Sequence, residues 1–189
     1  KIPDFDIKMD FHPSDFTQVN PQINKKMLKL AVELLNLNKN DNVLDLFSGI
    51  GNFTLPIAKK SNLCIGIEGC DILTKRAQEN AKSNNIKNTE FFTADLFQPE
   101  KIIPLIKQKY PDINKICLDP PRDGAFDLVK NIKILDPEMI LYVSCNPHTL
   151  ARDAQVLCHE HNYEITHAGI MDMFPHTKHV ESIALFTKR

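Results

Sequence analysis

The sequence predicts an α/β fold in which helices cover a mainly parallel, doubly wound sheet. Short apolar runs that suit buried strands alternate with segments whose apolar residues recur at helical spacing. A glycine-containing turn follows the first strand, and the next strand closes on an acidic residue. Near the C-terminus two strand-like runs are joined by a short segment without a helical pattern, so we expect them to pair antiparallel. Alternating strands and helices are typical of βαβ units with right-handed crossovers.

The composition indicates one globular domain. The chain has 189 residues, of which 42% are hydrophobic and 25% are charged, which suffices for a single domain with a sizeable core. We therefore interpret residues 1–189 as one domain, with residues 1–20 as an irregular lead-in, and we expect a monomer. The chain opens on Lys1 rather than on methionine, so we expect a C-terminal fragment of a longer protein.

Hydropathy, charge and cysteine content point away from membranes and disulfides. No apolar run approaches the ~20 residues that span a bilayer and no signal-peptide pattern is present, so we expect a cytoplasmic protein. The formal net charge of -1 gives no support to nucleic-acid binding, so any RNA contact must be local or lie on another part of the protein. The 5 cysteines lack disulfide or zinc spacing, which fits a reducing compartment. Three are expected in the core: Cys64, Cys117 and Cys158.

The first half of the chain predicts three helices and three strands. Asn20-Pro21 opens a helix, because asparagine caps free N–H groups and proline suits the first turn. Asp71 can cap the third helix, and the second runs over about 53–60. Strands are expected at short apolar runs bounded by turn residues, namely 43–47, 63–67 and 90–94.

The second half predicts three more helices and four more strands. A weak helix covers 101–109 with Pro104 in its first turn, and apolar residues over 128–135 form an amphipathic helix. Another helix follows Pro147. Strands are expected over 115–118, 139–143, 163–170 and 182–187.

Cys145 lies in the turn between the fifth strand and the helix that Asn146-Pro147 opens. In α/β sheets the carboxyl ends of the strands hold the ligands. A helix N-terminus also favours the thiolate, which is the attacking form of cysteine. Cys145 is therefore a candidate nucleophile, with a small buried hydrophobe as the alternative.

The segment Asp45-Leu-Phe-Ser-Gly49-Ile-Gly51 is a second candidate site. Its glycines let the backbone approach a ligand, and Glu68 at the next strand end can accept both hydroxyls of a ribose. This arrangement suits an adenosine-bearing cofactor better than a purely structural turn. A dinucleotide fingerprint needs a third glycine where Thr54 stands, so NAD is disfavoured. S-adenosylmethionine (SAM) needs no pyrophosphate cradle and is the predicted cofactor, with S-adenosylhomocysteine as its product.

Four motifs together resemble the RNA uracil-C5 methyltransferases and cover essentially the whole chain from Phe16 onward. The likeness is closer to the bacterial 23S rRNA members than to the tRNA members. The motifs stand in that family's order: Asp45 to Thr54, Asp119-Pro-Pro-Arg122, Ser144-Cys-Asn-Pro147 with Thr149-Leu-Ala-Arg-Asp153, and Asp172 to Glu181. The resemblance implies a class I SAM-dependent methyltransferase fold of seven strands with an antiparallel last strand. Full-length relatives carry an N-terminal RNA-binding barrel, and some carry an iron–sulfur module.

The resemblance also implies site residues. Cys145 would be the nucleophile and Glu181 the base. Further positions would line the SAM site beside Gly49 and Gly51: Gln18, Phe47, Asn52, Glu68, Asp119 and, more loosely, Asp95. Arg122 suits contact with a phosphate or carboxylate, and Pro121 stiffens the same loop. The spacing of His176, His179 and Glu181 is not that of a helical zinc motif, so no metal is expected.

The chemistry follows from the target. C5 of uracil is a poor nucleophile, but a thiolate added to C6 turns C5 into an enolate carbon that can attack a methyl donor. A base must then remove the C5 proton, and a carboxylate screened from water suits that step. The target base must be flipped out of its stack. Rival interpretations are a tRNA uracil-C5 enzyme, a SAM-dependent amino-methyltransferase, for which Cys145 and Glu181 are dispensable, and a non-catalytic RNA-binding module.

Overall fold

The protein is built on one twisted sheet of seven strands. The computed structural model describes residues 1–13, 15, 17–177 and 179–189. The strand order is β3-β2-β1-β4-β5-β7-β6, and all neighbours pair parallel except β7, which is antiparallel to both β5 and β6. The strands are β1 (Asn42–Leu46), β2 (Leu63–Glu68), β3 (Thr89–Thr93), β4 (Lys115–Leu118), β5 (Met139–Ser144), β6 (Tyr163–Met171) and β7 (Glu181–Lys188). The predicted doubly wound sheet with an antiparallel last strand is confirmed.

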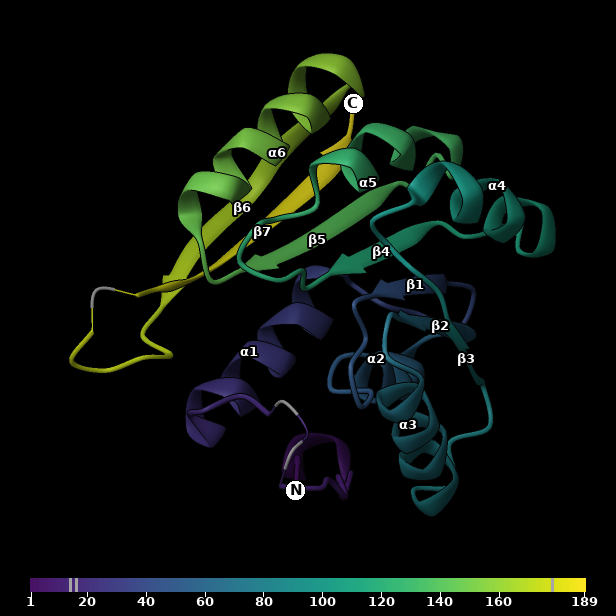
Figure 1. The fold of residues 1–189 in the computed structure, drawn as a ribbon, viewed down its shortest axis with the longest axis vertical. Helices are drawn as coiled ribbons and strands as arrows, with labels where there is room; N and C mark the ends of the chain where they lie inside the picture. Colours follow the sequence, from purple (N-terminus) through teal and green to yellow (C-terminus); the bar gives the residue numbers. More distant parts are fainter. Residues whose placement is uncertain (14, 16, 178) are drawn as a thin grey trace.

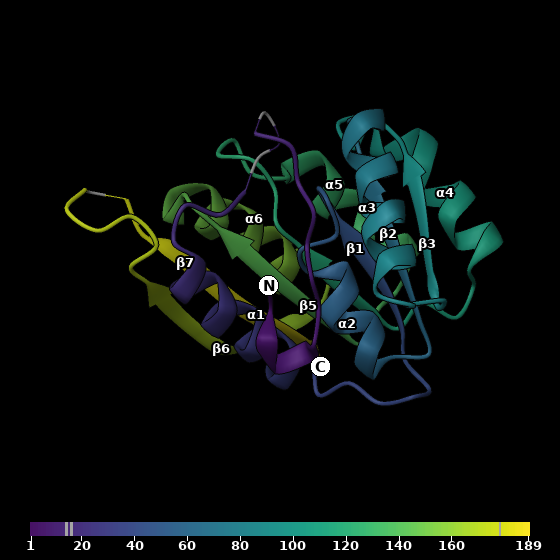
Figure 2. The same ribbon diagram turned by 90° about the horizontal axis from the view of Figure 1, so that it is seen from below.

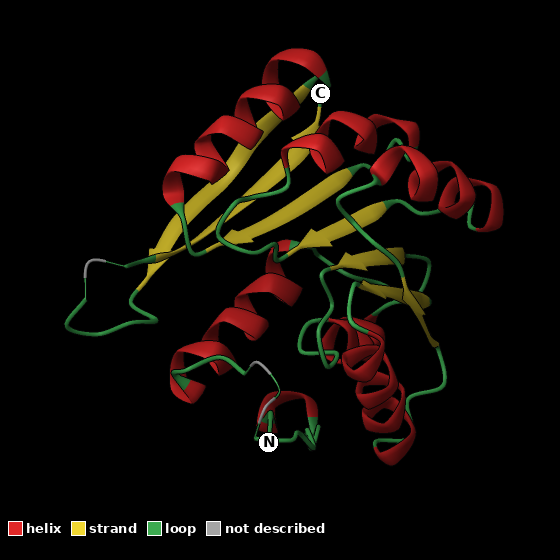
Figure 3. Cartoon of the chain, in the orientation of Figure 1, coloured by secondary structure: helices red, strands yellow, loops and turns green. Residues whose placement is uncertain are grey.

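Helices cover both faces of this sheet (Figures 1 and 3). The α-helices are α1 (Pro21–Leu34), α2 (Thr54–Lys60), α3 (Asp71–Ser83), α4 (Pro99–Lys109), α5 (Phe126–Asn131) and α6 (Pro147–Glu160). On one face α1 lies across β5, β7 and β6, while α2 and α3 lie across β1 to β3 (Figure 2). Helices α4, α5 and α6 cover the other face.

Alternation along the strands divides the core into two layers. Val43 and Cys64 pack towards α1, α2 and α3, whereas Leu44 and Ile65 pack towards α4, α5 and α6. Successive side chains of a strand point to opposite faces, so a strand covered on both sides is largely apolar along its length. Cys64 and Cys117 are fully buried as predicted, and Cys158 is partly buried against the second layer.

Several local expectations need correction. Helix α4 begins at Pro99, so Pro104 lies inside the helix and not in its first turn. The N-cap of α3 is Cys70, and Asp71 is instead the acidic residue of the first turn. A histidine at a polar helix end is ordinarily solvated, but His161, which follows α6, is buried and its Nε2 lies 3.0 Å from the carbonyl oxygen of Val129.

The lead-in segment, residues 1–20, is largely irregular but belongs to the core. Ile2 and Ile7 form an isolated antiparallel bridge around a short 3-10 helix, Pro3–Phe5. These apolar side chains are buried with those of α1 and α2. Asn20 then caps α1 as predicted, because its side chain accepts hydrogen bonds from the backbone of Gln22 and Ile23. Two residues of the family motifs, Phe16 and Lys178, lie outside the described residues.

Among the described residues, no helix combines the length and apolar character needed to cross a membrane.

Candidate active site

Three titratable side chains from three strand ends meet at one edge of the sheet. Cys145 follows β5, Asp119 follows β4, and Glu181 is the first residue of β7. Because β7 runs opposite to β5, its first residue lies at the edge where the parallel strands end. The strand registers bring the three groups together, because Leu118 pairs with Tyr142 and Ser144 pairs with Ser182. Burial, followed by the negative charges of Glu181 and Asp119, raises the pKa of Cys145.

The turn that carries Cys145 is held by its neighbours. The amide of Asn146 donates to Ser144 Oγ at 3.1 Å, and Ser144 Oγ donates to the carbonyl of Asn146 at 3.1 Å. The side chain of Asn146 caps α6 by accepting from the amide of His148 at 3.2 Å. A strand that ends abruptly at a capped helix therefore leaves Cys145 partly buried at the sheet edge.

In the free protein, the favourable effect of the backbone amide at this helix N-terminus on the Cys145 thiolate is outweighed. Burial raises the pKa of Cys145 most, and the charges of Glu181 and Asp119 add to this effect. Arg122 acts in the opposite sense but does not reverse it. The thiol is therefore held protonated and must transfer its proton before it can attack.

Glu181 is a buried acid. Its residue exposure is 3%, and burial raises its pKa from an ordinary 4.5 to about 7. A carboxyl group with that pKa exchanges protons near neutral pH, which is the property required of a general base. Burial, followed by the charges of Glu181 and Asp45, also raises the pKa of Asp119 well above its ordinary value.

The glycine turn after β1 is tied to the end of β2. The amide of Gly49 donates to Glu68 Oε2 at 2.9 Å, and the amide of Cys70 donates to Glu68 Oε1 at 3.0 Å. An ionised carboxylate offers about four acceptor positions, so Glu68 retains capacity for ligand hydroxyls. Gly51 has φ +92°, a conformation that L side chains rarely adopt, which explains the glycine at this position.

Asn52 and Gln18 lie where the lead-in and α1 approach this turn. Asn52 and Asn24 of α1 exchange two side-chain hydrogen bonds, at 3.0 and 3.1 Å. The amide of Asn52 therefore anchors the turn to α1. Gln18 is partly buried just before the cap of α1.

A cavity of about 270 Å³ opens between the ends of β1, β3 and β4. Phe47, at φ 66°, and Phe97 both line it, and their rings form a tilted pair with centroids 6.0 Å apart. Its lining comprises Phe47, Leu96, Phe97, Asp123, Gly124, Ala125, Phe126, Asp127, Leu128 and Arg152. Asp95 is exposed beside this lining, where its carboxylate accepts hydrogen bonds from Phe97 and Gln98 and its pKa is lowered chiefly by the Gln98 bond. Nothing in the sequence pattern pointed to Phe97.

The loop after β4 is clamped onto α6. The carbonyl of Arg122 accepts from Asn146 Nδ2 at 3.1 Å and from Thr149 Oγ1 at 3.3 Å. Further along, Asp153 Oδ2 accepts from the amide of Ala125 at 2.8 Å and from the hydroxyl of Tyr142 at 2.6 Å. The side chains of Pro121 and Arg122 stay exposed. These bonds fix the position of Asp119's loop relative to the turn that carries Cys145.

Asp45 is a buried carboxyl group in β1, the strand that leads into the glycine turn. It is fully buried, its Oδ2 accepts from the hydroxyl of Thr54, and burial raises its pKa to about 7. Thr54 stands where a dinucleotide fingerprint would have glycine, and its hydroxyl serves there as the hydrogen-bond donor to Asp45.

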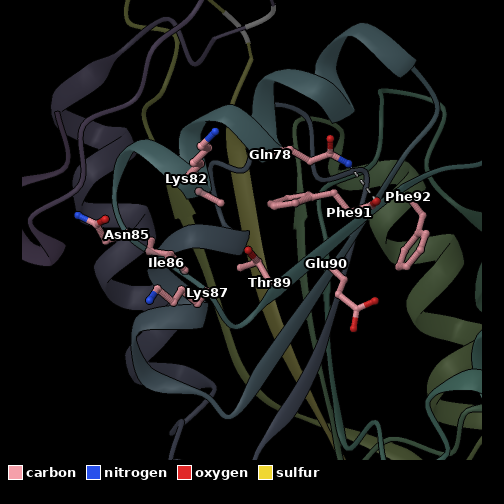
Figure 4. Close-up of a pocket in the computed structure, with 10 residues that line it drawn as sticks. Gln78, Lys82, Asn85, Ile86, Lys87, Thr89, Glu90, Phe91 and Phe92 are labelled. Carbon is pink, nitrogen blue, oxygen red and sulfur yellow. Dashed lines mark hydrogen bonds between the residues drawn. The ribbon is translucent and has the colours of Figure 1, made fainter.

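A larger hollow, of about 500 Å³, lies away from these residues (Figure 4). Edge strand β3 and the end of α3 form its walls, with Gln78 donating to the carbonyl of Phe91. None of the predicted site residues lines it. Among the described residues, no group of three or more His, Cys, Asp or Glu side chains could hold a metal ion.

The sheet order, the glycine turn and the acid that ends β2 together define a SAM-dependent methyltransferase fold, and solved structures agree. The crystal structure of Pyrococcus abyssi tRNA (uracil-54, C5)-methyltransferase in complex with S-adenosyl-L-homocysteine aligns at a TM-score of 0.79 with 30% identity, over 96% of this chain and 42% of that one. M. jannaschii TYW2 in complex with AdoMet has the same fold at a TM-score of 0.67 with 18% identity, over 97% of this chain and 82% of that one.

Comparisons of the sequence identify the family to which the chain belongs within this fold. A family model described as tRNA (Uracil-5-)-methyltransferase matches residues 1–189, and the chain belongs to that family. A Legionella pneumophila (strain Lens) protein named 23S rRNA (uracil(1939)-C(5))-methyltransferase RlmD is 50% identical over 188 residues, which is 100% of this chain and 42% of that protein. A Francisella tularensis subsp. novicida (strain U112) protein of the same name is 50% identical over 182 residues, 96% of this chain and 40% of that protein. The chain spans about two fifths of the length of these relatives.

Proposed function

We propose that this chain is a single catalytic domain that transfers a methyl group from SAM to C5 of a uracil in 23S rRNA. The observation that carries the proposal is the meeting of Cys145 with the buried Glu181 at one sheet edge. Relatives at 50% identity bear the name of 23S rRNA enzymes, whereas the solved tRNA enzyme is 30% identical. Identity therefore favours the ribosomal RNA.

The residues beside the glycine turn fit SAM. Glu68 has free acceptor positions for ribose hydroxyls, and the Phe47 and Phe97 rings offer an apolar wall for a planar base. Gly49, Gly51 and Asn52 belong to the turn and its end. Gln18, Asp95 and Asp119 stay predicted cofactor contacts from the family resemblance. When bound, SAM supplies an electrophilic methyl group.

Cys145 would supply the nucleophile. The ionised form of Asp119, whose pKa burial raises well above its ordinary value, can accept the thiol proton, which leaves Glu181 available as the base of the later step. The sulfur lone pair forms a bond to C6 of the uracil, and the C5–C6 electron pair moves onto C5 as an enolate. C5 would then take up the methyl group of SAM, whose sulfur–carbon bond breaks so that S-adenosylhomocysteine leaves.

Glu181 would complete the reaction. After methyl transfer, C5 carries both a proton and a methyl group, and an ionised Glu181 can remove the proton. The electron pair returns to the C5–C6 bond, the C6–sulfur bond breaks, and the cysteine leaves. A raised pKa makes the carboxylate a stronger base than an exposed glutamate.

The exposed end of the loop after β4 would meet the RNA. Arg122 and Pro121 project from a loop that Asn146 and Thr149 hold in place. A guanidinium at that position can bind a phosphate of the flipped nucleotide with two parallel hydrogen bonds.

The test is a substrate comparison with the full-length protein and labelled SAM. A 23S rRNA transcript should acquire label that nuclease digestion and mass spectrometry identify as 5-methyluridine, and Cys145→Ser should abolish it. Label in a tRNA transcript alone would favour the tRNA activity named for the P. abyssi relative. A methylated exocyclic amine would end the proposal in favour of an amino-methyltransferase.

A further inference from the structure

One face of α3 carries three polar side chains that contact the lead-in segment. Residues four apart lie on the same side of a helix, and Arg76, Asn80 and Asn84 follow that spacing. Asn84 contacts Lys8, Asn80 contacts Asp10, and Arg76 Nε lies 3.4 Å from Asp15 Oδ2. The segment thus runs antiparallel to α3, towards the edge of the sheet where Glu68 and Cys70 stand.

Both asparagines bind the main chain of the segment. Asn84 accepts from the amide of Lys8 at 2.8 Å and donates to its carbonyl at 2.8 Å. Asn80 accepts from the amide of Asp10 at 2.8 Å and donates to its carbonyl at 3.1 Å. A side-chain amide has the donor and acceptor needed for this pairing.

Asn80 differs from Asn84 in one respect. Its second N–H donates to the carbonyl of Ile50, in the middle of the glycine turn, at 3.1 Å. Asn80 is fully buried, so one amide satisfies buried groups of the lead-in segment and of the glycine turn at once.

A second link joins the same two parts of the chain. Beyond the lead-in, Asn24 of α1 exchanges two hydrogen bonds with Asn52, which follows the glycine turn. The stretch from Asp10 to Asn24 is therefore tied to the turn at both ends. Movement of this stretch must alter the turn, and a ligand that stabilises the turn must stabilise the stretch.

We propose that Asn80 is a positioning residue that couples docking of the lead-in segment to binding of SAM at the glycine turn. The inference rests on the proposed function only in taking the turn and Glu68 as the cofactor site. Coupling between two sites is reciprocal, so SAM should tighten the segment by the same factor by which the docked segment tightens SAM.

The experiment uses the full chain with S-adenosylhomocysteine as the probe. Calorimetry gives its affinity, and hydrogen exchange followed by mass spectrometry gives the protection of residues 8–15. In the wild type, the probe should slow exchange in this stretch. Asn80→Ala should weaken the affinity by about tenfold, the scale expected when buried hydrogen bonds are lost, and should abolish the protection.

Asn84→Ala is the control, because it removes an equivalent pair of main-chain bonds to Lys8 without touching the glycine turn. It also removes the bond from the Asn84 side chain to the main-chain carbonyl of Asn80, and it leaves the side chain of Asn80 in place. It should speed exchange near Lys8 while leaving the affinity within about twofold of the wild type. Equal losses of affinity in Asn80→Ala and Asn84→Ala would overturn the coupling and leave a merely structural role.

A second variant covers the case in which Asn80→Ala does not fold. Asp10→Pro removes the amide that Asn80 accepts from and leaves the bond to Ile50 in place. It should weaken the probe, whereas Lys8→Pro should not. Unchanged affinity in Asp10→Pro would overturn the proposal. A wild type that binds no S-adenosylhomocysteine would overturn the cofactor site itself, which is a separate result.

Discussion

Cys145 and Glu181 each lie one residue beyond the same rung of the sheet, in which Ser144 of β5 pairs with Ser182 of β7. The antiparallel register brings the two side chains to one edge although they are far apart in the sequence. Burial and the charge of Glu181 both raise the pKa of the Cys145 thiol. Burial also raises the pKa of Glu181 itself to about 7. The following predictions test what this pair does.

Replacement of either residue should stop the reaction at a different step. Cys145→Ala should form no adduct and transfer no methyl group, because C5 is never activated. Glu181→Gln should still add to C6 and accept the methyl group, but it should remain bonded to the methylated RNA, since nothing removes the C5 proton. A denaturing gel with labelled SAM, full-length protein and RNA should show a shifted, labelled band only for Glu181→Gln.

The double variant gives the control for this order of events. It should behave like Cys145→Ala, because one step precedes the other and the two effects cannot add. Full activity with alanine at position 145 would eliminate the covalent mechanism.

The raised pKa of Glu181 should make both stability and turnover depend on pH. Its pKa rises from 4.5 to about 7 on folding, so the folded state binds the proton more tightly than the unfolded state. Its stabilising contribution is therefore complete below about pH 4.5 and is lost as the pH rises through about 7. Thermal unfolding across this window should show a smaller loss of stability in Glu181→Gln than in the wild type.

Turnover should follow the opposite trend to stability. The ionised carboxylate removes the C5 proton, so resolution of the adduct should speed up as the pH rises towards and past about 7. Single-turnover release of methylated RNA measures this step. A flat profile between pH 5.5 and 8.5, chosen to bracket roughly this pKa, would argue that Glu181 is not the base.

Glu68 should matter more to cofactor binding than Asp95. Glu68→Ala removes ligand acceptors and also frees the amides of Gly49 and Cys70, so affinity for S-adenosylhomocysteine should fall by about 1–3 kcal/mol. Asp95→Ala removes an exposed carboxylate that closes its own local turn, and it should cost less. Calorimetry on both variants measures the two losses of affinity. A larger loss in Asp95→Ala than in Glu68→Ala would place the acidic contact to the cofactor in the loop after β3.

Gly124 should be intolerant of a side chain. It has φ +75°, and an added Cβ would lie 2.8 Å from both Arg152 Nη2 and Asp153 Oδ2, at the clamp between the loop after β4 and α6. Gly124→Ala should therefore lower the free energy of unfolding by about 1–3 kcal/mol, as measured by urea denaturation. Gly69→Ala is the control, because its nearest neighbour would be 3.9 Å away. Equal stability of the two variants would show that the contact between the loop after β4 and α6 can rearrange around the added methyl group without loss of stability.

Most of the fold could be predicted because its signals are local. Apolar runs of strand length, helical spacing and the Asn20 and Asn146 caps each depend on a few adjacent residues, and the structure places elements at all of them. The expectations about secondary structure and exposure that were wrong concern the ends of elements. The start of α4 at Pro99, the cap of α3 and the burial of His161 depend on packing partners that lie elsewhere in the sequence.

The sequence by itself determined the parts of the site that lie within single segments. The glycine turn, the acid that ends β2 and the capped turn at Cys145 are short motifs whose geometry comes from their own backbone. The resemblance to the family could be stated from the same motifs, since this chain carries the family's residue types in the family's order. The roles of the individual site residues stay predictions.

Only the tertiary structure decided how these parts act on one another. Strand β7 inserts between β5 and β6, and this register places Glu181 beside Cys145. The direction of the Cys145 pKa reverses the expectation from the helix N-terminus, because burial and two carboxylates from other strands outweigh a local dipole. Asn80 joins the lead-in segment to the glycine turn only because α3 packs against both. Burial and long-range electrostatics depend on which segments meet in space, and no local pattern records that.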